Sequence, residues 1–307
     1  MNSVLLSLLR CPVCKGQVSP DGASLRCQGC TNAYTVRDGI PIMLRADSPL
    51  LQNHKEHAPA ALQKTIRLTG KPWSTEFLGR AQRKLARPLK KLKKVGTFSR
   101  PKGTDKSYLH LLQELPEDSL GLDLGARKHR ITRHCVTLDV YPWVNVDVVG
   151  DGHELPFGNN AFDFVWCNAV LEHVPYPTKV AEEITRILKP GALAFIQTPF
   201  MEGIHHYPHD YFRFTIQGLR VLFPGLQEVK CGVSAGPSQV LPDLLQQYFL
   251  FFSLTPSGVK RSSVVLYPYV LLTNCIVAPL RLLDYVLKGR QGYARWARAY
   301  YFVGRKN

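Results

Sequence analysis

Two pairs of cysteines near the N-terminus constrain the fold of this chain more than any other feature of its sequence. Cys11 and Cys14 form one Cys-x-x-Cys pair, Cys27 and Cys30 form the other, and twelve residues separate the pairs. Each pair suits a tight turn that aims two sulfur atoms at one point, so the four thiolates predict a closed tetrahedral zinc site. A closed site has no open position for water, which indicates a structural zinc ion. The alternatives are two disulfides, a redox dithiol, or four unrelated cysteines.

Composition and the N-terminus indicate a globular protein in a reducing compartment. The chain has 307 residues, of which 45% are hydrophobic and 20% charged, and this balance excludes wholesale disorder. Eight cysteines are too few for a disulfide scaffold of this length. The apolar run Val4–Leu9 is short and lacks a basic flank before it, so it does not resemble a signal peptide. We therefore expect a cytoplasmic location.

Positive charge is concentrated in one segment. Residues 64–102 hold thirteen Lys and Arg and one acidic residue, a charge of +12 within the formal +16 of the whole chain. Apolar residues recur there at intervals of three and four, at Phe77, Leu78, Ala81, Leu85, Leu89, Leu92 and Val95. This pattern predicts a basic amphipathic helix, which suits an anionic membrane surface or nucleic acid. The alternative is a solvated basic face that packs on the rest of the protein.

The cysteine segment resembles a known family. The runs at 8–16, 25–30 and 34–44, including Val36-Arg-Asp-Gly-Ile-Pro-Ile, are similar to the zinc ribbons that serve as activator subunits of tRNA, rRNA and release-factor methyltransferases. Members of that family stabilise their methyltransferases through a β-zipper and a hydrophobic face. The resemblance implies that a methyltransferase follows in this chain and that the ribbon shields an apolar surface of it.

Acidic residues end successive predicted strands in the middle of the chain. Residues 119–125, 136–140 and 161–168 have the apolar pattern of buried strands. Asp123 ends the first strand before Gly125, and Asp139 ends the second sixteen residues later, a spacing that suits a carboxylate on the ribose of a nucleoside cofactor. Asp151, followed by Gly152, is the third acidic residue in this series. An NAD-dependent dehydrogenase would need pyrophosphate-binding glycines that are absent here.

These strands carry a second resemblance. The motifs at 122–125, 139, 151–157, 162–165, 168–174 and 186–191 are similar to those of class I S-adenosylmethionine-dependent methyltransferases. The resemblance implies that Asp123 and Gly125 hold the methionine end of the cofactor, Asp139 the ribose, Asp151 with Gly152 the adenine, and that Asn168 lies beneath the sulfonium. One departure is that Arg127 and His129 replace the second and third glycines usual in the family.

We therefore predict a doubly wound, mostly parallel, seven-stranded Rossmann-like α/β sheet. The expected domains are a zinc ribbon (1–47), a basic linker (48–106) and the methyltransferase domain (107–307), which contains an apolar helical insertion (236–292) before the last strand. Residues 299–306 are the expected last strand, paired antiparallel with 227–233. That pairing argues against a single membrane crossing within the insertion, whose apolar surface either packs on the domain or enters one leaflet.

Histidines supply the candidate catalytic groups. The segment 203–215 resembles the His-x-x-Pro-x-Asp-Tyr-x-Arg-Phe-Thr stretch of methyltransferases from polysaccharide and cell-envelope gene clusters. His206 and His209 in this segment are the candidates for the general base or for contacts with the methyl acceptor. His173 is a third candidate, expected at a helix start. A structural loop, with Asp210 paired to Arg213, is the alternative.

The acceptor is the least determined part of the function. We expect a hydroxyl on a sugar, glycolipid or other small molecule near a membrane surface. Cys167-Asn168-Ala169 is not an Asn-Pro-Pro-aromatic motif and disfavours methylation of exocyclic base amines. The second hypothesis is an RNA methyltransferase, suggested by the ribbon and the +12 segment. The third is a catalytically silent scaffold that binds a partner through the ribbon.

Overall fold

The computed structural model describes residues 3–48, 50, 108–127, 130–205, 209–251 and 278–307. Its strands are β1 (Val18–Asp21), β2 (Ser24–Cys27), β3 (Ala33–Arg37), β4 (Ile40–Met43), β5 (Gly121–Leu124), β6 (Cys135–Asp139), β7 (Val148–Gly150), β8 (Phe162–Asn168), β9 (Leu188–Pro199), β10 (Leu226–Ala235) and β11 (Ala299–Lys306). Its α-helices are α1 (Ser3–Leu8), α6 (Tyr108–Gln113), α7 (Pro177–Ile187), α8 (Ile216–Leu222), α9 (Val240–Phe251) and α11 (Asp284–Leu287). Short 3₁₀ helices are η1 (Gly152–Glu154), η2 (Leu171–His173), η3 (Pro237–Gln239), η4 (Ala278–Leu283) and η5 (Tyr293–Trp296).

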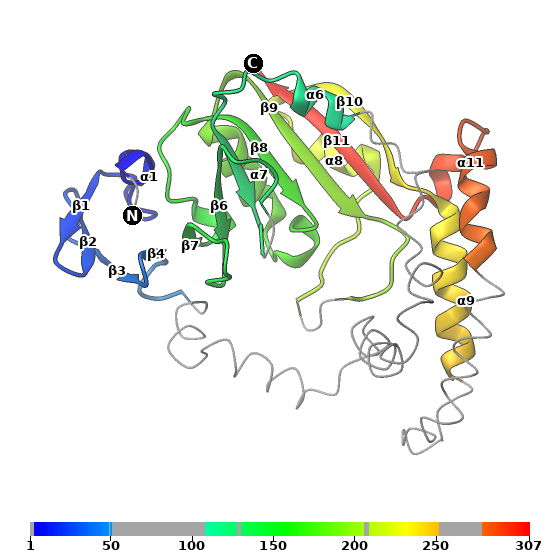
Figure 1. Ribbon diagram of the computed structural model, residues 1–307, viewed down its shortest axis with the longest axis horizontal. Coiled ribbons are helices and arrows are strands. Elements are labelled where there is room, and N and C mark those ends of the chain that lie inside the picture. The colour runs from blue at the N-terminus through cyan, green and yellow to red at the C-terminus, as the bar shows by residue number, and fades with distance from the viewer. Residues whose placement is uncertain (1–2, 49, 51–107, 128–129, 206–208, 252–277) are drawn as a thin grey trace, which may run out of the picture.

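The central sheet has the predicted doubly wound arrangement (Figure 1). Its strands follow the order β7-β6-β5-β8-β9-β11-β10, and β11 alone runs antiparallel to its neighbours. The predicted pairing of the last strand is confirmed, since Gln227 lies opposite Arg305 and Val233 opposite Tyr300. The chain therefore reverses its strand order beside β5, and the carboxyl ends of β5, β6, β7 and β8 share one edge, where ligands bind in sheets of this kind.

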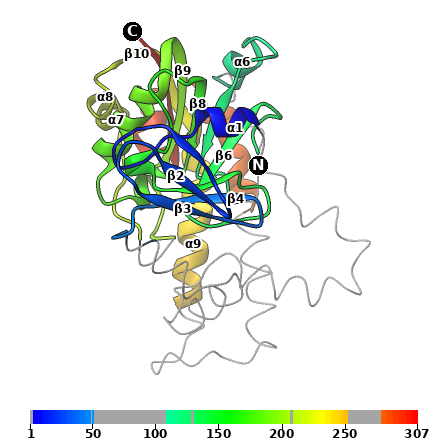
Figure 2. The ribbon, with the colours of Figure 1, turned by 90° about the vertical axis from the view of Figure 1, so that its left-hand side faces the viewer.

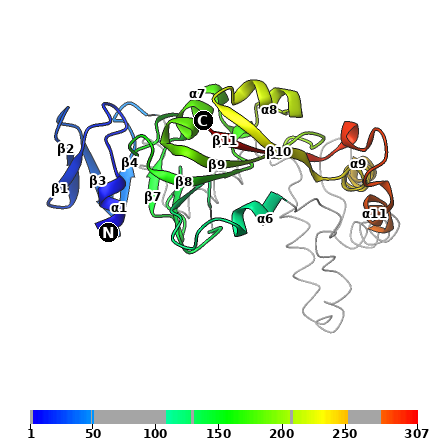
Figure 3. The same ribbon diagram turned by 90° about the horizontal axis from the view of Figure 1, so that it is seen from above.

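Successive side chains of a strand point to opposite faces of a sheet, and both faces of this sheet are covered by apolar side chains. Every residue of β5 and β6 is buried, as expected of parallel strands covered on both sides. On one face Val165 packs in the same cluster as Ile184 of α7 and Leu219 of α8. On the other, Tyr108 of α6 stacks on Tyr301 with ring centroids 4.3 Å apart. Figure 3 shows α7 and α8 on one side of the sheet and α6 on the other.

The helix α7 follows directly from its sequence. Pro177 occupies its first turn, where a missing N–H costs nothing. Val180, Ala181, Ile184 and Ile187 then recur on one face and are buried. This face presses the helix onto the sheet and fixes the loop before it, which contains η2.

The N-terminal ribbon, residues 3–44, continues the same sheet (Figures 1 and 2). Its strand β4 pairs in parallel with β7, with Ile42 opposite Val149 and Met43 opposite Gly150. Leu9 and Met43 are fully buried in the core cluster that includes the strands of the central sheet. Lys15 Nζ adds an ion pair to Glu183 Oε2 at 3.0 Å. The ribbon is thus part of the apolar core of the central sheet.

Between β10 and β11 the described residues are mainly helical. Helix α9 packs beside η4 and α11, and several of their apolar side chains are exposed, at Leu241, Leu244, Tyr248, Leu282, Leu283, Tyr285 and Val286. Among the described residues no helix has both the length and the apolar content needed to span a bilayer. The predicted amphipathic helix at 77–95 and the central part of the predicted insertion lie outside the residues described.

Candidate functional site

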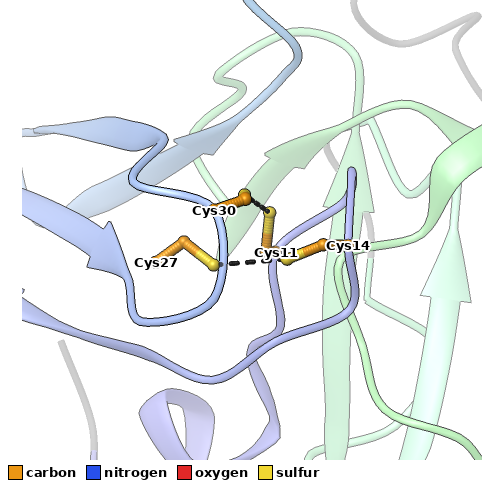
Figure 4. Close-up of side chains that lie close together, drawn as sticks. All are labelled: Cys11, Cys14, Cys27 and Cys30. Carbon is orange, nitrogen blue, oxygen red and sulfur yellow. Dashed lines mark hydrogen bonds between the residues drawn. The ribbon is translucent and has the colours of Figure 1, made fainter.

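The four N-terminal cysteines converge as predicted (Figure 4). Cys11 and Cys14 come from the turn after α1, Cys27 ends β2, and Cys30 lies in the turn that follows β2. The Sγ atoms of Cys11 and Cys30 lie 3.5 Å apart and those of Cys14 and Cys27 lie 3.4 Å apart. All four Sγ atoms are within 4.8 Å of one another. Zinc–sulfur bonds of about 2.3 Å place tetrahedral sulfurs about 3.8 Å apart, so these thiols fit one zinc ion.

Polar groups around the sulfurs can donate hydrogen bonds to metal-bound thiolates. Asn32 Nδ2 donates to Cys30 Sγ at 3.1 Å, and the Gly29 N–H donates to Cys27 Sγ at 3.3 Å. The Tyr34 hydroxyl lies 2.9 Å from Cys11 Sγ, so it can donate to a thiolate there. Such outer contacts orient metal ligands and tune their basicity. The site has four sulfur ligands and no built-in open position, as a structural zinc site requires.

The three predicted acidic side chains lie at the tips of neighbouring strands. Asp123 is in β5, Asp139 ends β6, and Asp151 directly follows β7. Asp123 Oδ2 accepts a hydrogen bond from the Ile131 N–H at 3.0 Å. Because β5, β6 and β7 are adjacent and parallel, their acidic tips share one edge of the sheet.

The loop after β5 is tied to the tip of β6. The Gly125 N–H donates to Leu138 O at 2.8 Å, and the Arg127 N–H donates to Asp139 Oδ2 at 3.0 Å. Gly125 has a φ of +75°, and a Cβ there would lie 2.4 Å from Val170 Cγ2. Arg127, which replaces a family glycine, has a φ of 52°. The backbone therefore keeps the glycine-like conformation, at a cost of about 1–2 kcal/mol for a residue with a side chain.

Burial and hydrogen bonding act in opposite directions on these carboxyl groups. Burial raises the pKa of Asp139, although the N–H groups of Tyr141 and Arg127 favour its ionised form. Burial also acts to raise the pKa of Asp151, but hydrogen bonds from His153 hold that pKa below its ordinary value. Asp151 also caps η1, because its Oδ1 accepts from the His153 N–H at 2.9 Å.

The three carboxylates fit the cofactor that the resemblance implies. S-adenosylmethionine presents ribose hydroxyls and an adenine amino group as donors and carries positive sulfonium and ammonium groups. Each of these complements a carboxylate, and hydroxyls that donate to Asp139 would offset part of the cost of its burial. Gly152, the residue after Asp151, is buried, and a Cβ there would lie 3.5 Å from Val180 Cγ1 and 3.9 Å from Leu124 Cδ1.

Asn168 lies at the carboxyl end of β8 with its side chain exposed. The next residue, Ala169, has a φ of 55°, and its N–H donates to Gln197 O at 2.9 Å. This left-handed residue turns the chain sharply away from the sheet into η2. Asn168 therefore lies exposed at the carboxyl edge of the sheet.

A cluster of three side chains that the sequence did not single out as a group follows this turn. Glu172, His173 and His205 place one ligand atom each within 4.8 Å of one another. The Glu172 side chain is fully buried, and burial raises its pKa to about 7, against the lowering effect of the Arg213 guanidinium. His173 is the last residue of the 3₁₀ helix η2 rather than the start of an α-helix, so that prediction of its local structure was wrong.

The other predicted histidines are placed differently. His209 Nδ1 lies 3.2 Å from the Tyr211 hydroxyl, and its ring is exposed, while His206 lies outside the described residues. Asp210 pairs with Arg213, as the alternative interpretation of this loop predicted, with Arg213 Nη2 2.9 Å from Asp210 Oδ2. The signal that could have revealed the cluster is the Glu172-His173 dipeptide just after Asn168, together with a second histidine, His205, in the loop after β9.

Comparisons with known families match both parts of the chain. Residues 3–39 match the model of Trm112p-like proteins, and residues 103–196 match the model of a methyltransferase domain. The first match covers the cysteine cluster. The second covers the strands that carry Asp123, Asp139, Asp151 and Asn168.

Individual relatives match one part each. A demethylmenaquinone methyltransferase of Listeria monocytogenes serotype 4a is 37% identical over 101 residues, which cover 31% of this chain and 41% of that protein. The chain thus spans less than half the length of this relative. A UPF0434 protein of Pseudomonas savastanoi pv. phaseolicola is 47% identical over 53 residues, covering 17% of this chain and 87% of that protein. The solved complex of the Haloferax volcanii Trm112 methyltransferase activator with a methyltransferase covers 65% of this chain and 88% of the matched chain, at 20% identity and a TM-score of 0.38.

Proposed function

Since the chain belongs to the class I S-adenosylmethionine-dependent methyltransferases and carries a Trm112p-like zinc ribbon, we propose that it methylates a hydroxyl of a sugar, glycolipid or other small molecule. The observation that carries the methyltransferase assignment is the row of carboxylates on the adjacent tips of β5, β6 and β7. An adenosyl ligand along that edge would meet one acidic group at each strand.

Each residue of the edge has a proposed role. Asp139 accepts the ribose hydroxyls, Asp151 with Gly152 contacts the adenine, and Asp123 with Gly125 holds the methionine end. Asn168 lies beneath the sulfonium. The bound cofactor supplies a methyl group on an activated sulfonium, so the chain has to align the acceptor in line and exclude water.

The acceptor also has to lose a proton if it is a hydroxyl. His173, His206 and His209 are the proposed contacts, because a histidine near neutral pH can hold that proton. Support comes from the position of η2, which begins three residues after Asn168 and contacts β9. The relative named for demethylmenaquinone is consistent with a small-molecule acceptor.

The ribbon has a proposed structural role in the same chain. Cys11, Cys14, Cys27 and Cys30 hold a structural zinc ion, which keeps β4 in position to pair with β7. Because Leu9 and Met43 are fully buried in the shared core, the zinc ion would stabilise the catalytic sheet as well. Metal binding of this kind contributes directly to folding free energy.

We further propose a cytoplasmic enzyme that can associate with the inner face of a membrane. The exposed apolar side chains of α9, η4 and α11 and the basic segment 64–102 support this. Binding to vesicles of phosphatidylglycerol, compared with vesicles of phosphatidylcholine across a salt series, tests it. Equal failure to bind both would contradict the membrane proposal and leave the methyltransferase proposal in place.

An RNA acceptor is the second candidate, favoured by the Trm112p-like match and the +12 segment. The deciding experiment supplies radiolabelled S-adenosylmethionine to the full chain with a lipid extract, a metabolite extract or total RNA. We expect label in the lipid or metabolite fraction with the wild type and in no fraction with Asp139→Ala. Label in RNA would replace the proposed acceptor, and failure of the wild type to bind the cofactor in calorimetry would refute the proposed function.

A further inference from the structure

Glu172 has an unusual environment for a carboxylate. Its side chain is fully buried, and neither of its oxygen atoms has a hydrogen-bond partner among the residues described. Two imidazole nitrogens face it, with His173 Nε2 at 3.6 Å and His205 Nε2 at 3.9 Å from Oε1. A buried carboxylate without a hydrogen bond is costly, and the cost is relieved either by uptake of a proton or by a cation that lies beside it.

The contacts of the two rings define which nitrogen carries the proton. His173 Nδ1 lies 2.7 Å from the carbonyl oxygen of His209, and this oxygen can only accept. His205 Nδ1 lies 3.3 Å from Asp210 Oδ2 and 3.4 Å from Gly203 O, which are also acceptors. In both neutral rings Nδ1 therefore carries the hydrogen and Nε2 carries the lone pair.

This arrangement brings two ring nitrogens and one carboxylate oxygen within 4.8 Å of one another. Doubly protonated rings could donate to Glu172 from Nε2, but 3.6 and 3.9 Å exceed the distances of about 2.7–3.2 Å that such bonds have. Metal–ligand bonds of about 2.0–2.2 Å place tetrahedral ligands about 3.4 Å apart, close to the observed separations. A cation fits between these atoms better than protons do.

We propose that Glu172, His173 and His205 bind a divalent transition-metal ion, separate from the four-cysteine site. Two imidazoles and one carboxylate suit zinc, manganese or iron, whereas magnesium and calcium prefer oxygen ligands. Both histidines have the outer support typical of metal ligands. His173 donates its Nδ1–H to the His209 carbonyl oxygen, and His205 donates its Nδ1–H toward Asp210 Oδ2 and Gly203 O. Arg213 in turn fixes Asp210 through Nη2 at 2.9 Å.

The site is open on one side. The side chains of His173 and His205 are 19% and 33% exposed, whereas that of Glu172 is not exposed. Three protein ligands and an accessible side leave a coordination position for an oxygen of another molecule. On the premise of the proposed function, this oxygen belongs to the methyl acceptor. With both ring nitrogens engaged, His173 would then position the acceptor, and His206 and His209 would be the candidates for the base.

The test counts metal ions on the full chain. The protein is loaded with Zn²⁺, desalted, and examined by native mass spectrometry. We expect two zinc ions per wild-type chain and one in Glu172→Gln and in His205→Ala. The control is His110→Ala, which removes a histidine that contacts Glu114 Oε1 at 2.8 Å on an exposed helix, and it should keep two. Replacement of zinc by Co²⁺ should add weak visible bands from the second ion without sulfur charge transfer.

The possible outcomes separate the two proposals. One zinc ion per wild-type chain, or two in both site variants, would overturn the metal site. His205→Ala keeps the test valid if Glu172→Gln does not fold, because His205 is partly exposed, and thermal melting checks both. S-adenosylmethionine binding is measured on the same samples, so a chain with one zinc ion that binds the cofactor refutes only the metal site.

Discussion

Gly125 and Gly191 offer a matched pair of substitutions that tests the close packing beneath the proposed cofactor. Their φ angles are +75° and +78°, but an added Cβ would lie 2.4 Å from Val170 Cγ2 at position 125 and would meet nothing within 4 Å at position 191. Left-handed backbone costs a residue with a Cβ about 1–2 kcal/mol, which applies to both alanine variants. Forcing Val170 aside adds about 1–3 kcal/mol to Gly125→Ala alone.

We therefore expect Gly125→Ala to lower the free energy of unfolding in urea by about 2–5 kcal/mol and Gly191→Ala by about 1–2 kcal/mol. Calorimetry should show weaker S-adenosylmethionine binding only for Gly125→Ala, because this loop is hydrogen-bonded to the tip of β6. Adding Val170→Ala should restore about 1 kcal/mol or more in a double-mutant cycle. Equal unfolding free energies for the two single variants would refute the steric argument.

Four further predictions concern the cofactor, the core shared by the ribbon and the sheet, the zinc ion and the methyl acceptor. Asp139→Ala should abolish detectable cofactor binding in calorimetry while zinc content stays unchanged, because it removes the carboxylate proposed to accept both ribose hydroxyls; an unaltered affinity contradicts that role. Met43→Ala should destabilise the whole chain by about 2–5 kcal/mol, since a fully buried side chain is lost, whereas Val4→Ala at an exposed position should cost under about 0.5 kcal/mol. Stripping the ribbon zinc with a thiol reagent and a chelator should likewise lower the melting temperature of the central sheet, and melting of that sheet at an unchanged temperature would argue against the shared core. His209→Ala should leave cofactor affinity unchanged and lower turnover, and undiminished turnover would exclude His209 as the base.

The parts of the fold with a local signal could be predicted from the sequence. Cysteine spacing predicted the sulfur cluster, because two turns suffice to bring four thiols together. The apolar runs before Asp123, Asp139 and Asn168 predicted strands that the structure contains. The last strand, 299–306, was expected from its resemblance to the final antiparallel strand of a methyltransferase sheet, and its predicted partner, 227–233, is confirmed.

Features that depend on distant segments could not be predicted in the same way. Glu172 and His205 are far apart in sequence, and their approach depends on the length of β9 and on the loop that returns after it. The positive φ of Arg127 also has no sequence signal, since the residue type disfavours it and the surrounding contacts impose it. The domain limits and the roles of the individual site residues remain predictions.

The parallel pairing of β4 with β7 has a consequence for how this protein relates to separate ribbon proteins. An edge strand with unpaired amide and carbonyl groups can pair with a strand of another polypeptide. Here β4 of the same chain pairs with β7. A tethered segment competes at an effective concentration in about the millimolar range, so a free homologue at ordinary cellular abundance would rarely displace it. Dilution cannot separate the two parts, and their ratio is fixed at synthesis.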